Sequence, residues 1–245
     1  GIDIGSSKVS VLIGQADEAG RLEVVGRGSA PNRGTRRGSI VNAEAAVEGL
    51  KLATEEAEVM AGVEISEAFV SVAGSDVRSH NSKGMVSVAR KDREVTRSDI
   101  DRVLEAARSA ALPSDRDILQ AMPQEFILDG QGGIVDPLGM LGRKLEVTVH
   151  LVTGHATRTR TLLTCVNRAG IEVKEMVFEP LATASGVLTP DERELGALVI
   201  DIGAGTSSYA YFITGEAHHS AVLPLAAGHF TNDLAMVLRT LFAEA

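Results

Sequence analysis

The sequence predicts an α/β protein with two related halves, and two observations support this fold class. The segments GIDIGSSKV (residues 1–9) and VIDIGAGTS (residues 199–207) share one pattern, in which Asp alternates with apolar residues before a Gly-rich centre. The alternation indicates a strand, and the Gly-rich centre indicates a tight turn. The second observation is the order that follows each hairpin: a strand, a Gly-rich link and a helix.

Each predicted hairpin has a carboxylate on its first strand, namely Asp3 or Asp201, and bare backbone N–H groups at its tip. Such N–H groups suit phosphate, and the carboxylate suits a hydrated Mg²⁺ ion. For either Asp alone, a turn-capping residue is the alternative. Two matching copies favour a fold that binds a nucleotide from both sides.

The composition narrows the class of protein. The 245 residues suffice for one large or two medium domains, and the formal charge of −9 argues against sequence-independent binding of nucleic acid. The single cysteine, Cys165, excludes an internal disulfide and a Cys-rich metal cluster. No apolar run approaches the roughly 20 residues that span a bilayer. The chain starts without Met inside a strand motif, so we expect a few preceding residues.

In the first half, the pattern predicts three strands, a helix and a fourth strand, which is half of a doubly wound unit. Asn42 is the expected helix N-cap and Gly62 the residue that ends the helix. The Gly- and Arg-rich segment before this helix is expected to be a solvated loop. The expected elements are the hairpin 1–14, the strand 21–26, the loop 28–38, the helix 42–62 and the strand 65–73.

Residues 74–154 are a predicted insertion with one helix and three short strands. Thr96 and Asp99 have the spacing of a helix capping box. Polar residues fill 79–84, so we place the first strand after them. The expected strands are 85–88, 118–128 with an interruption near Pro123, and 145–151, with a loop at 129–142.

The remainder of the chain repeats the order of the first half and stops before its fourth strand. We expect 1–73 and 155–196 to form one subdomain, with 197–245 as part of a second. The expected helices are 157–169, 181–188 and 232–241, and residues 189–194 form a connection. The expected strands are 171–178, 198–202, 209–213 and 221–224.

The two hairpin turns supply the candidate binding residues. Asp3 and Asp201 are candidates for holding Mg²⁺ through water, and the phosphate candidates are Gly5, Ser6, Ser7, Lys8, Gly203, Gly205 and Thr206. Gly228 and Thr231 either approach the nucleotide or cap a helix. Glu179 either orients an attacking water or starts a helix.

Other kinds of site find little support. None of the six histidines has a partner at metal-ligand spacing, so we expect all of them to be structural or solvent-facing. The order of Ser, His and Asp residues does not suggest a catalytic triad. No Gly-rich loop is followed by Gly-Lys-Ser/Thr, so the nucleotide site is not a Walker A site.

The motifs resemble those of the actin, hexokinase and heat-shock-chaperone ATPase superfamily, whose fold is ribonuclease H-like. Residues 1–9 resemble its first phosphate motif, 199–207 its second, and FEPLA (178–182) its first connecting motif. Within the superfamily the chain resembles the FtsA family of bacterial cell-division proteins. The opening residues, LTPDERELG (188–196) and an insertion at the place of the family's subdomain 1C carry this resemblance.

The resemblance implies an actin-like protein that binds ATP and Mg²⁺ and is at most a weak ATPase, with Glu179 in the position of the catalytic residue. It implies filaments at the cytoplasmic face of the inner membrane at the division site. The implied partners are the FtsZ ring, which the filaments tether, other division proteins and the membrane, through a C-terminal helix absent from this chain. Subdomain 1A would comprise 1–73 and 155–196, subdomain 1C 74–154, and 197–245 part of subdomain 2A.

The family continues beyond the equivalent of Ala245 into the adenine-binding part of the site. We therefore expect these 245 residues to bind ATP without high affinity. A pilus-assembly scaffold of the PilM type, which shares the 1C layout, is an alternative. A sugar kinase is a weaker one, because a single cysteine excludes a zinc loop and no Asp stands out as the catalytic base.

Overall fold

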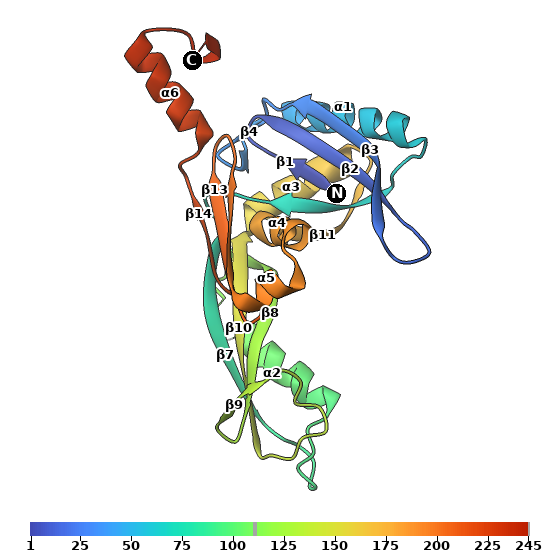
Figure 1. Ribbon diagram of the computed structural model, residues 1–245, viewed down its shortest axis with the longest axis vertical. Coiled ribbons are helices and arrows are strands. Elements are labelled where there is room, and N and C mark those ends of the chain that lie inside the picture. Colours follow the sequence, from blue (N-terminus) through green and yellow to red (C-terminus); the bar gives the residue numbers. More distant parts are fainter. Residues whose placement is uncertain (110–111, 245) are drawn as a thin grey trace.

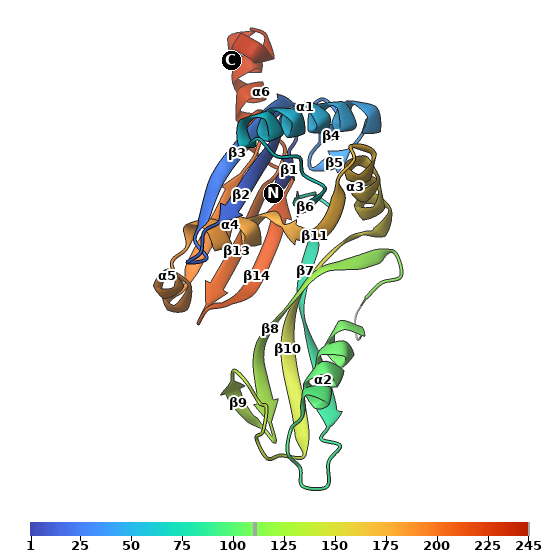
Figure 2. The same cartoon turned by 90° about the vertical axis from the view of Figure 1, so that its right-hand side faces the viewer.

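The computed structural model describes residues 1–109 and 112–244, and their strands form three sheets and one small hairpin. The molecule is elongated (Figure 1), with a five-stranded sheet toward one end and a four-stranded sheet that extends to the other. A three-stranded sheet lies beside the junction of the two, as the side view shows (Figure 2). In the described part of the chain, no helix has the length and apolar character that crossing a bilayer requires.

The five-stranded sheet has the order β11-β6-β1-β2-β3. Its strands β1, β2 and β3 are antiparallel neighbours, and β6 and β11 continue the sheet in parallel with β1. Parallel neighbours need a crossover, and α1 (Ala43–Ala61) and α3 (Ala156–Arg168) form part of these connections and pack on the sheet. The strands are β1 (Ile2–Ile4), β2 (Lys8–Ala16), β3 (Leu22–Pro31), β6 (Glu67–Val72) and β11 (Glu172–Phe178).

Helix α1 has the two boundaries that the sequence predicts. The side chain of Asn42 accepts a hydrogen bond from the backbone N–H of Ala45, and Gly62 ends the helix with a φ of 69°. The helix also lies very close to β3. A Cβ atom on Gly28 would lie 1.8 Å from the backbone oxygen of Ala53, so this crossing requires glycine.

The four-stranded sheet belongs to residues 74–154 and has the order β7-β10-β8-β9. Helix α2 (Arg97–Ser109) covers one face and buries Val103 against Leu145 and the other apolar side chains of β10. The Asp99 carboxylate accepts hydrogen bonds from the backbone N–H and the hydroxyl of Thr96, which confirms the predicted cap. The strands are β7 (Arg78–Ser87), β8 (Arg116–Leu128), β9 (Gln131–Ile134) and β10 (Lys144–His155).

The three-stranded sheet, β12-β13-β14, shares its core with the inserted region. Phe178 and Leu181 pack in this core together with Leu119 of β8 and Val152 of β10. The long strands of the insertion therefore contribute to two cores. The elements here are α4 (Glu179–Val187), α5 (Pro190–Leu195), β12 (Ala197–Ile202), β13 (Ser207–Ile213), β14 (Glu216–Leu223), α6 (Ala227–Leu238) and a 3-10 turn (Phe242–Glu244).

The predicted loop at 28–38 is wrong in two places. Strand β3 continues to Pro31. A glycine that suggests a loop in this segment is instead a strand residue whose lack of a side chain lets α1 pack closely on β3. A short hairpin of β4 (Thr35–Arg36) and β5 (Ser39–Ile40) follows. Arg37 and Gly38 at its tip have positive φ angles of 50° and 70°.

Other boundaries also differ from the prediction, among them the start of β14, which is at Glu216 rather than at 221, and the end of β10, which is at His155 rather than at 151. The polar segment 79–84 lies inside β7, where Ser82 donates a hydrogen bond to the backbone oxygen of Ala107. The predicted loop at 129–142 contains β9, and the connection at 189–194 is mostly α5, which has a capping box between Thr189 and Glu192. Helix α6 starts at Ala227 rather than near residue 232, because the His229 ring caps its first turn.

Candidate functional site

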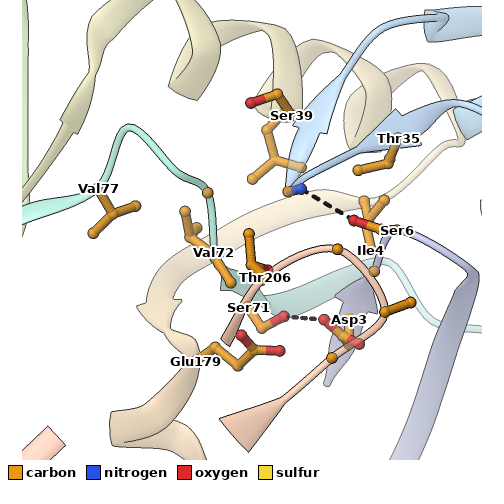
Figure 3. Close-up of a pocket in the computed structure, with 18 of the residues that line it drawn as sticks. Asp3, Ile4, Ser6, Thr35, Ser39, Ser71, Val72, Val77, Glu179 and Thr206 are labelled. Carbon is orange, nitrogen blue, oxygen red and sulfur yellow. Dashed lines mark hydrogen bonds between the residues drawn. The ribbon is translucent and has the colours of Figure 1, made fainter. Parts of the chain in front are cut away.

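A cavity of about 440 Å³ lies between the first hairpin, the second hairpin and the N-terminus of helix α4. Figure 3 shows part of its lining, with Asp3, Ser6, Thr206 and Glu179 around one space. The structure therefore brings the two motifs together, although Asp3 and Asp201 are 198 positions apart in the sequence. The sequence-predicted residues that line the cavity are Asp3, Gly5, Ser6, Ser7, Lys8, Glu179, Asp201, Gly203, Gly205 and Thr206.

The first turn joins β1 to β2 and is held by the residue that follows β3 and by the small hairpin. The buried Asn32 side chain donates a hydrogen bond to the Gly5 backbone oxygen over 2.8 Å. The backbone N–H of Gly38 donates to the Ser6 hydroxyl over 3.1 Å (Figure 3). Lys8 begins β2 with an exposed side chain that also lines the cavity. The turn is thus fixed before any ligand arrives.

The second turn meets the first at Gly205. A Cβ atom on Gly205 would lie 2.5 Å from the Ser6 hydroxyl oxygen, so glycine is required for this approach. Gly203 closes the turn by donating its N–H to the Thr206 backbone oxygen over 3.0 Å. Gly228 is not among the residues that line the cavity; its N–H donates to the Ala204 backbone oxygen and holds the turn from behind.

Four carboxylates line this space: Asp3, Glu179 and Asp201 from the predicted motifs, and Asp76. Asp3 accepts a 2.6 Å hydrogen bond from the Ser71 hydroxyl (Figure 3), and Asp201 accepts one of 3.2 Å from Thr183. Burial raises the pKa of Asp3, and the Ser71 hydrogen bond partly offsets this rise.

Glu179 begins α4, and its carboxylate accepts a 3.0 Å hydrogen bond from the Ser208 hydroxyl. Burial raises the pKa of Glu179 to about 7, and the charges of Asp201 and Asp3 contribute to the rise. A cation beside these groups would lower the pKa values that burial has raised. The donor set therefore fits Mg²⁺. In the described residues, no cluster of three His, Cys, Asp or Glu side chains could ligate a metal directly, so the fit is to an ion that keeps its waters.

The sequence does not reveal several lining residues. Arg158 in the first turn of α3 lines the cavity and forms a 2.9 Å ion pair with Asp76. Ser39, from the unpredicted hairpin, also lines it and accepts a 3.1 Å hydrogen bond from Arg158. The one available signal was a cation in the first turn of a helix, where the helix dipole disfavours positive charge.

The most buried histidine has a structural environment. His150 is 1% exposed, and its ring nitrogens lie 2.6 Å from the Asn81 side-chain oxygen and 2.8 Å from the Ser220 hydroxyl. It therefore joins β10 to β7 and to β14. Burial lowers the pKa of His150 to about 4, with smaller contributions from His219 and other histidines nearby.

Comparisons with known proteins agree with this arrangement. A family model described as the SHS2 domain inserted in FtsA matches residues 74–153, and one described as cell division protein FtsA matches 198–245. The FtsA of Pseudomonas aeruginosa is 46% identical over 240 residues, which are 98% of this chain. The chain belongs to the FtsA family. The resemblance that the motifs suggest is thereby confirmed.

Other FtsA relatives support the same assignment. Those of Bacillus subtilis and Escherichia coli K12 are 37% and 35% identical, over 100% and 98% of this chain. The chain spans 57% of the Pseudomonas aeruginosa protein and 55% and 57% of these two.

Solved structures confirm the fold class. The PilM–PilN type IV pilus biogenesis complex aligns with a TM-score of 0.73 at 16% identity, covering 100% of this chain and 66% of that chain. The ethanolamine utilization protein EutJ from Carboxydothermus hydrogenoformans aligns with a TM-score of 0.55 at 16% identity, covering 99% and 57%. Together with the SHS2 match, they confirm an actin-like α/β fold with an inserted α+β unit.

Proposed function

We propose that the chain binds the phosphates of Mg²⁺-ATP between its two hairpin turns. The observation that carries this proposal is the contact of the two turns at Gly205 and Ser6, beside a cavity with carboxylates on its other walls. Backbone N–H groups of two Gly-rich turns can then donate to phosphate oxygens from opposite sides. Membership of the FtsA family agrees with this assignment.

Each predicted site residue has a definite part in the proposal. The first turn, with Gly5, Ser6, Ser7 and Lys8, donates hydrogen bonds to the phosphates, and Lys8 adds positive charge. The second turn, with Gly203, Gly205 and Thr206, does the same from the opposite side. Gly228 supports the second turn through Ala204 rather than through the ligand.

The carboxylates act on the ion and on water. Asp3 and Asp201 would hold Mg²⁺ through water, and the chemistry that the ion would supply there is neutralisation of phosphate charge. Glu179 orients a water molecule toward the terminal phosphate, held by Ser208. Its raised pKa of about 7 suits a carboxyl that exchanges a proton with water near neutral pH.

At the level of the cell, we propose an actin-like subunit of bacterial cell division. It assembles into filaments at the cytoplasmic face of the inner membrane, tethers the FtsZ ring and contacts other division proteins. Sequence identities of 35–46% to FtsA proteins support this role over that of a PilM-type scaffold. The PilM structure shares only 16% sequence identity with the chain, so its similarity is one of fold. The inserted unit at 74–154 is the proposed contact region for neighbouring subunits and partners.

A titration followed by amide NMR tests the nucleotide site. Mg²⁺-ATP at millimolar concentration should shift the amide signals of Gly5, Gly203 and Gly205, whereas adenosine should leave them in place. This readout also detects the weak affinity that we expect of this chain. Unchanged signals of all three glycines would refute the phosphate site.

The cellular role needs a different experiment, in which a variant replaces the natural protein in its own gene. The change Gly205→Val places a side chain on the Ser6 hydroxyl and should prevent the two turns from meeting. We expect cells that fail to divide and grow as filaments, with the variant protein present at normal abundance. Normal division would refute the role, and defective pili with normal division would favour the PilM-type alternative.

A further inference from the structure

Arg158 is a cation on the wall of the phosphate cavity that the motif residues do not explain. It lies in the first turn of α3, and that turn contributes Arg158 and Thr159 to the lining, with Leu162 one turn further on. Unpaired backbone N–H groups give a helix start partial positive charge, so a cation there is electrostatically unfavourable. The guanidinium is thus a cation on the cavity lining, and its charge is balanced by the neighbouring carboxylate of Asp76.

The guanidinium is held in place by two contacts at the edge of the first phosphate turn. Its Nη1 atom lies 2.9 Å from Oδ1 of Asp76 and 3.1 Å from the Ser39 hydroxyl. Ser39 follows Gly38, whose N–H donates to the hydroxyl of Ser6. Arg158 is thus connected to the first turn through the tip of the small hairpin.

Asp76 is placed to keep Arg158 in this position in the absence of an anion. Its side chain is 16% exposed, and Oδ2 accepts a hydrogen bond from the backbone N–H of His155 over 3.1 Å. A Cβ atom on Gly74 would lie 2.7 Å from Asp76 Oδ1, so the carboxylate folds over a residue that has no side chain. The arginine side chain itself is 50% exposed and has freedom to turn toward the cavity.

We propose that Arg158 binds the terminal phosphate of a nucleoside triphosphate by exchanging its ion pair with Asp76 for the phosphate oxygens. Guanidinium groups pair readily with phosphate, and an ion pair whose arginine is half exposed to solvent competes weakly with it. Arg158 thereby distinguishes a triphosphate from a diphosphate, which lacks the phosphate nearest this wall. This inference rests on the nucleotide binding proposed above and adds a residue outside the two phosphate motifs.

The test compares Mg²⁺-ATP with Mg²⁺-ADP by amide NMR titration of the chain. Arg158→Ala should weaken ATP binding about tenfold to a hundredfold, the usual range for a charged hydrogen bond, and should change ADP binding by less than about twofold. Arg160→Ala, two residues further along the same helix and outside the cavity lining, is the matched control and should bind both nucleotides as the unaltered chain does. Equal losses for ATP and ADP, or no loss for either, would overturn the inference.

Asp76→Asn provides a second measurement with the opposite sign. The amide can still accept the hydrogen bond from His155 but no longer holds the guanidinium by charge, so ATP should bind about threefold more tightly and ADP unchanged. If Asp76→Asn weakens ATP binding as Arg158→Ala does, the Arg158–Asp76 ion pair acts only by stabilising the local structure, and the inference is wrong. If the unaltered chain binds neither nucleotide, the proposed function fails first, and that result is visible without any variant.

Discussion

Lowering the pH below about 6.5 should destabilise the fold through His150, because the buried ring is neutral in the folded state. Its pKa is lowered from 6.5 to about 4, so the unfolded chain binds a proton in this interval that the folded chain does not. The free energy of unfolding is unaffected by this group well above pH 6.5 and decreases as the pH falls from 6.5 toward 4. The loss is about 1 kcal/mol at pH 5.5 and roughly 2–3 kcal/mol at pH 4.5.

Urea unfolding of the unaltered chain and of His150→Gln at several pH values measures this loss. Glutamine can retain hydrogen bonds to Asn81 and Ser220 but does not titrate. The carboxyl groups with shifted pKa values, such as Asp3 and Glu179, are present in both proteins, so their effects cancel in the difference. The free energy of unfolding should fall more steeply with acid in the unaltered chain. Parallel pH profiles would refute the reasoning about His150.

Three further changes test other parts of the structure. Glu179→Gln should raise the free energy of unfolding by about 1–3 kcal/mol at pH 8 and by little at pH 4, because the unfolded chain ionises this carboxyl above about pH 4.5 whereas the folded chain resists its ionisation up to about pH 7; equal effects at both pH values would contradict this. Gly28→Ala should lower the melting temperature strongly, since its methyl group would overlap the Ala53 backbone oxygen; an unchanged melting temperature would show that the helix shifts without cost. Thr189→Ala removes the capping box with Glu192 and should cost about 1 kcal/mol in urea unfolding, and a loss below about 0.3 kcal/mol would argue against the cap.

The parts of the fold that follow from local chemistry could be predicted from the sequence. Asn before an apolar helical stripe and Gly after it are typical caps of a helix, and Asn42 and Gly62 have these roles here. The Asp-containing hairpins were recognisable because their strands alternate and their turns are rich in glycine. Their meeting at Gly205 could be expected only from the repetition of the motif, and the distance to Ser6 required the structure.

Glycine shows where local inference fails. In the structure, Gly28 lies in strand β3, and its lack of a side chain lets helix α1 pack closely on that strand. In the sequence, a glycine within a polar segment suggests a loop instead. The position of Arg158 on the cavity wall could not be predicted for a related reason. Its side chain is held by Asp76, which is 82 positions away in the sequence. The single local signal is a cation in the first turn of a helix, and only the fold brings Arg158 and Asp76 to the same wall.

The polar segment inside β7 is explained by a neighbouring sheet edge. Ser79 and Asn81 donate side-chain hydrogen bonds to backbone oxygens of β14, and Gln124 of β8 donates to a third. His150 adds its contact with the Ser220 hydroxyl. Polar residues are needed here because β14 is an edge strand whose outer carbonyl groups lack a strand partner.

These bonds relate the inserted unit to the nucleotide cavity. Strand β14 ends at Leu223, and Ala227 a few residues later already lines the cavity beside the second phosphate turn. At the other attachment, Asp76 of the inserted unit itself lines the cavity and pairs with Arg158 of α3, and Arg116 of β8 donates to the Asp76 backbone oxygen over 2.7 Å. The insertion is therefore attached at both walls of the cavity. A change in the spacing of the two phosphate turns would move the two attachments relative to each other, and the inserted sheet with them.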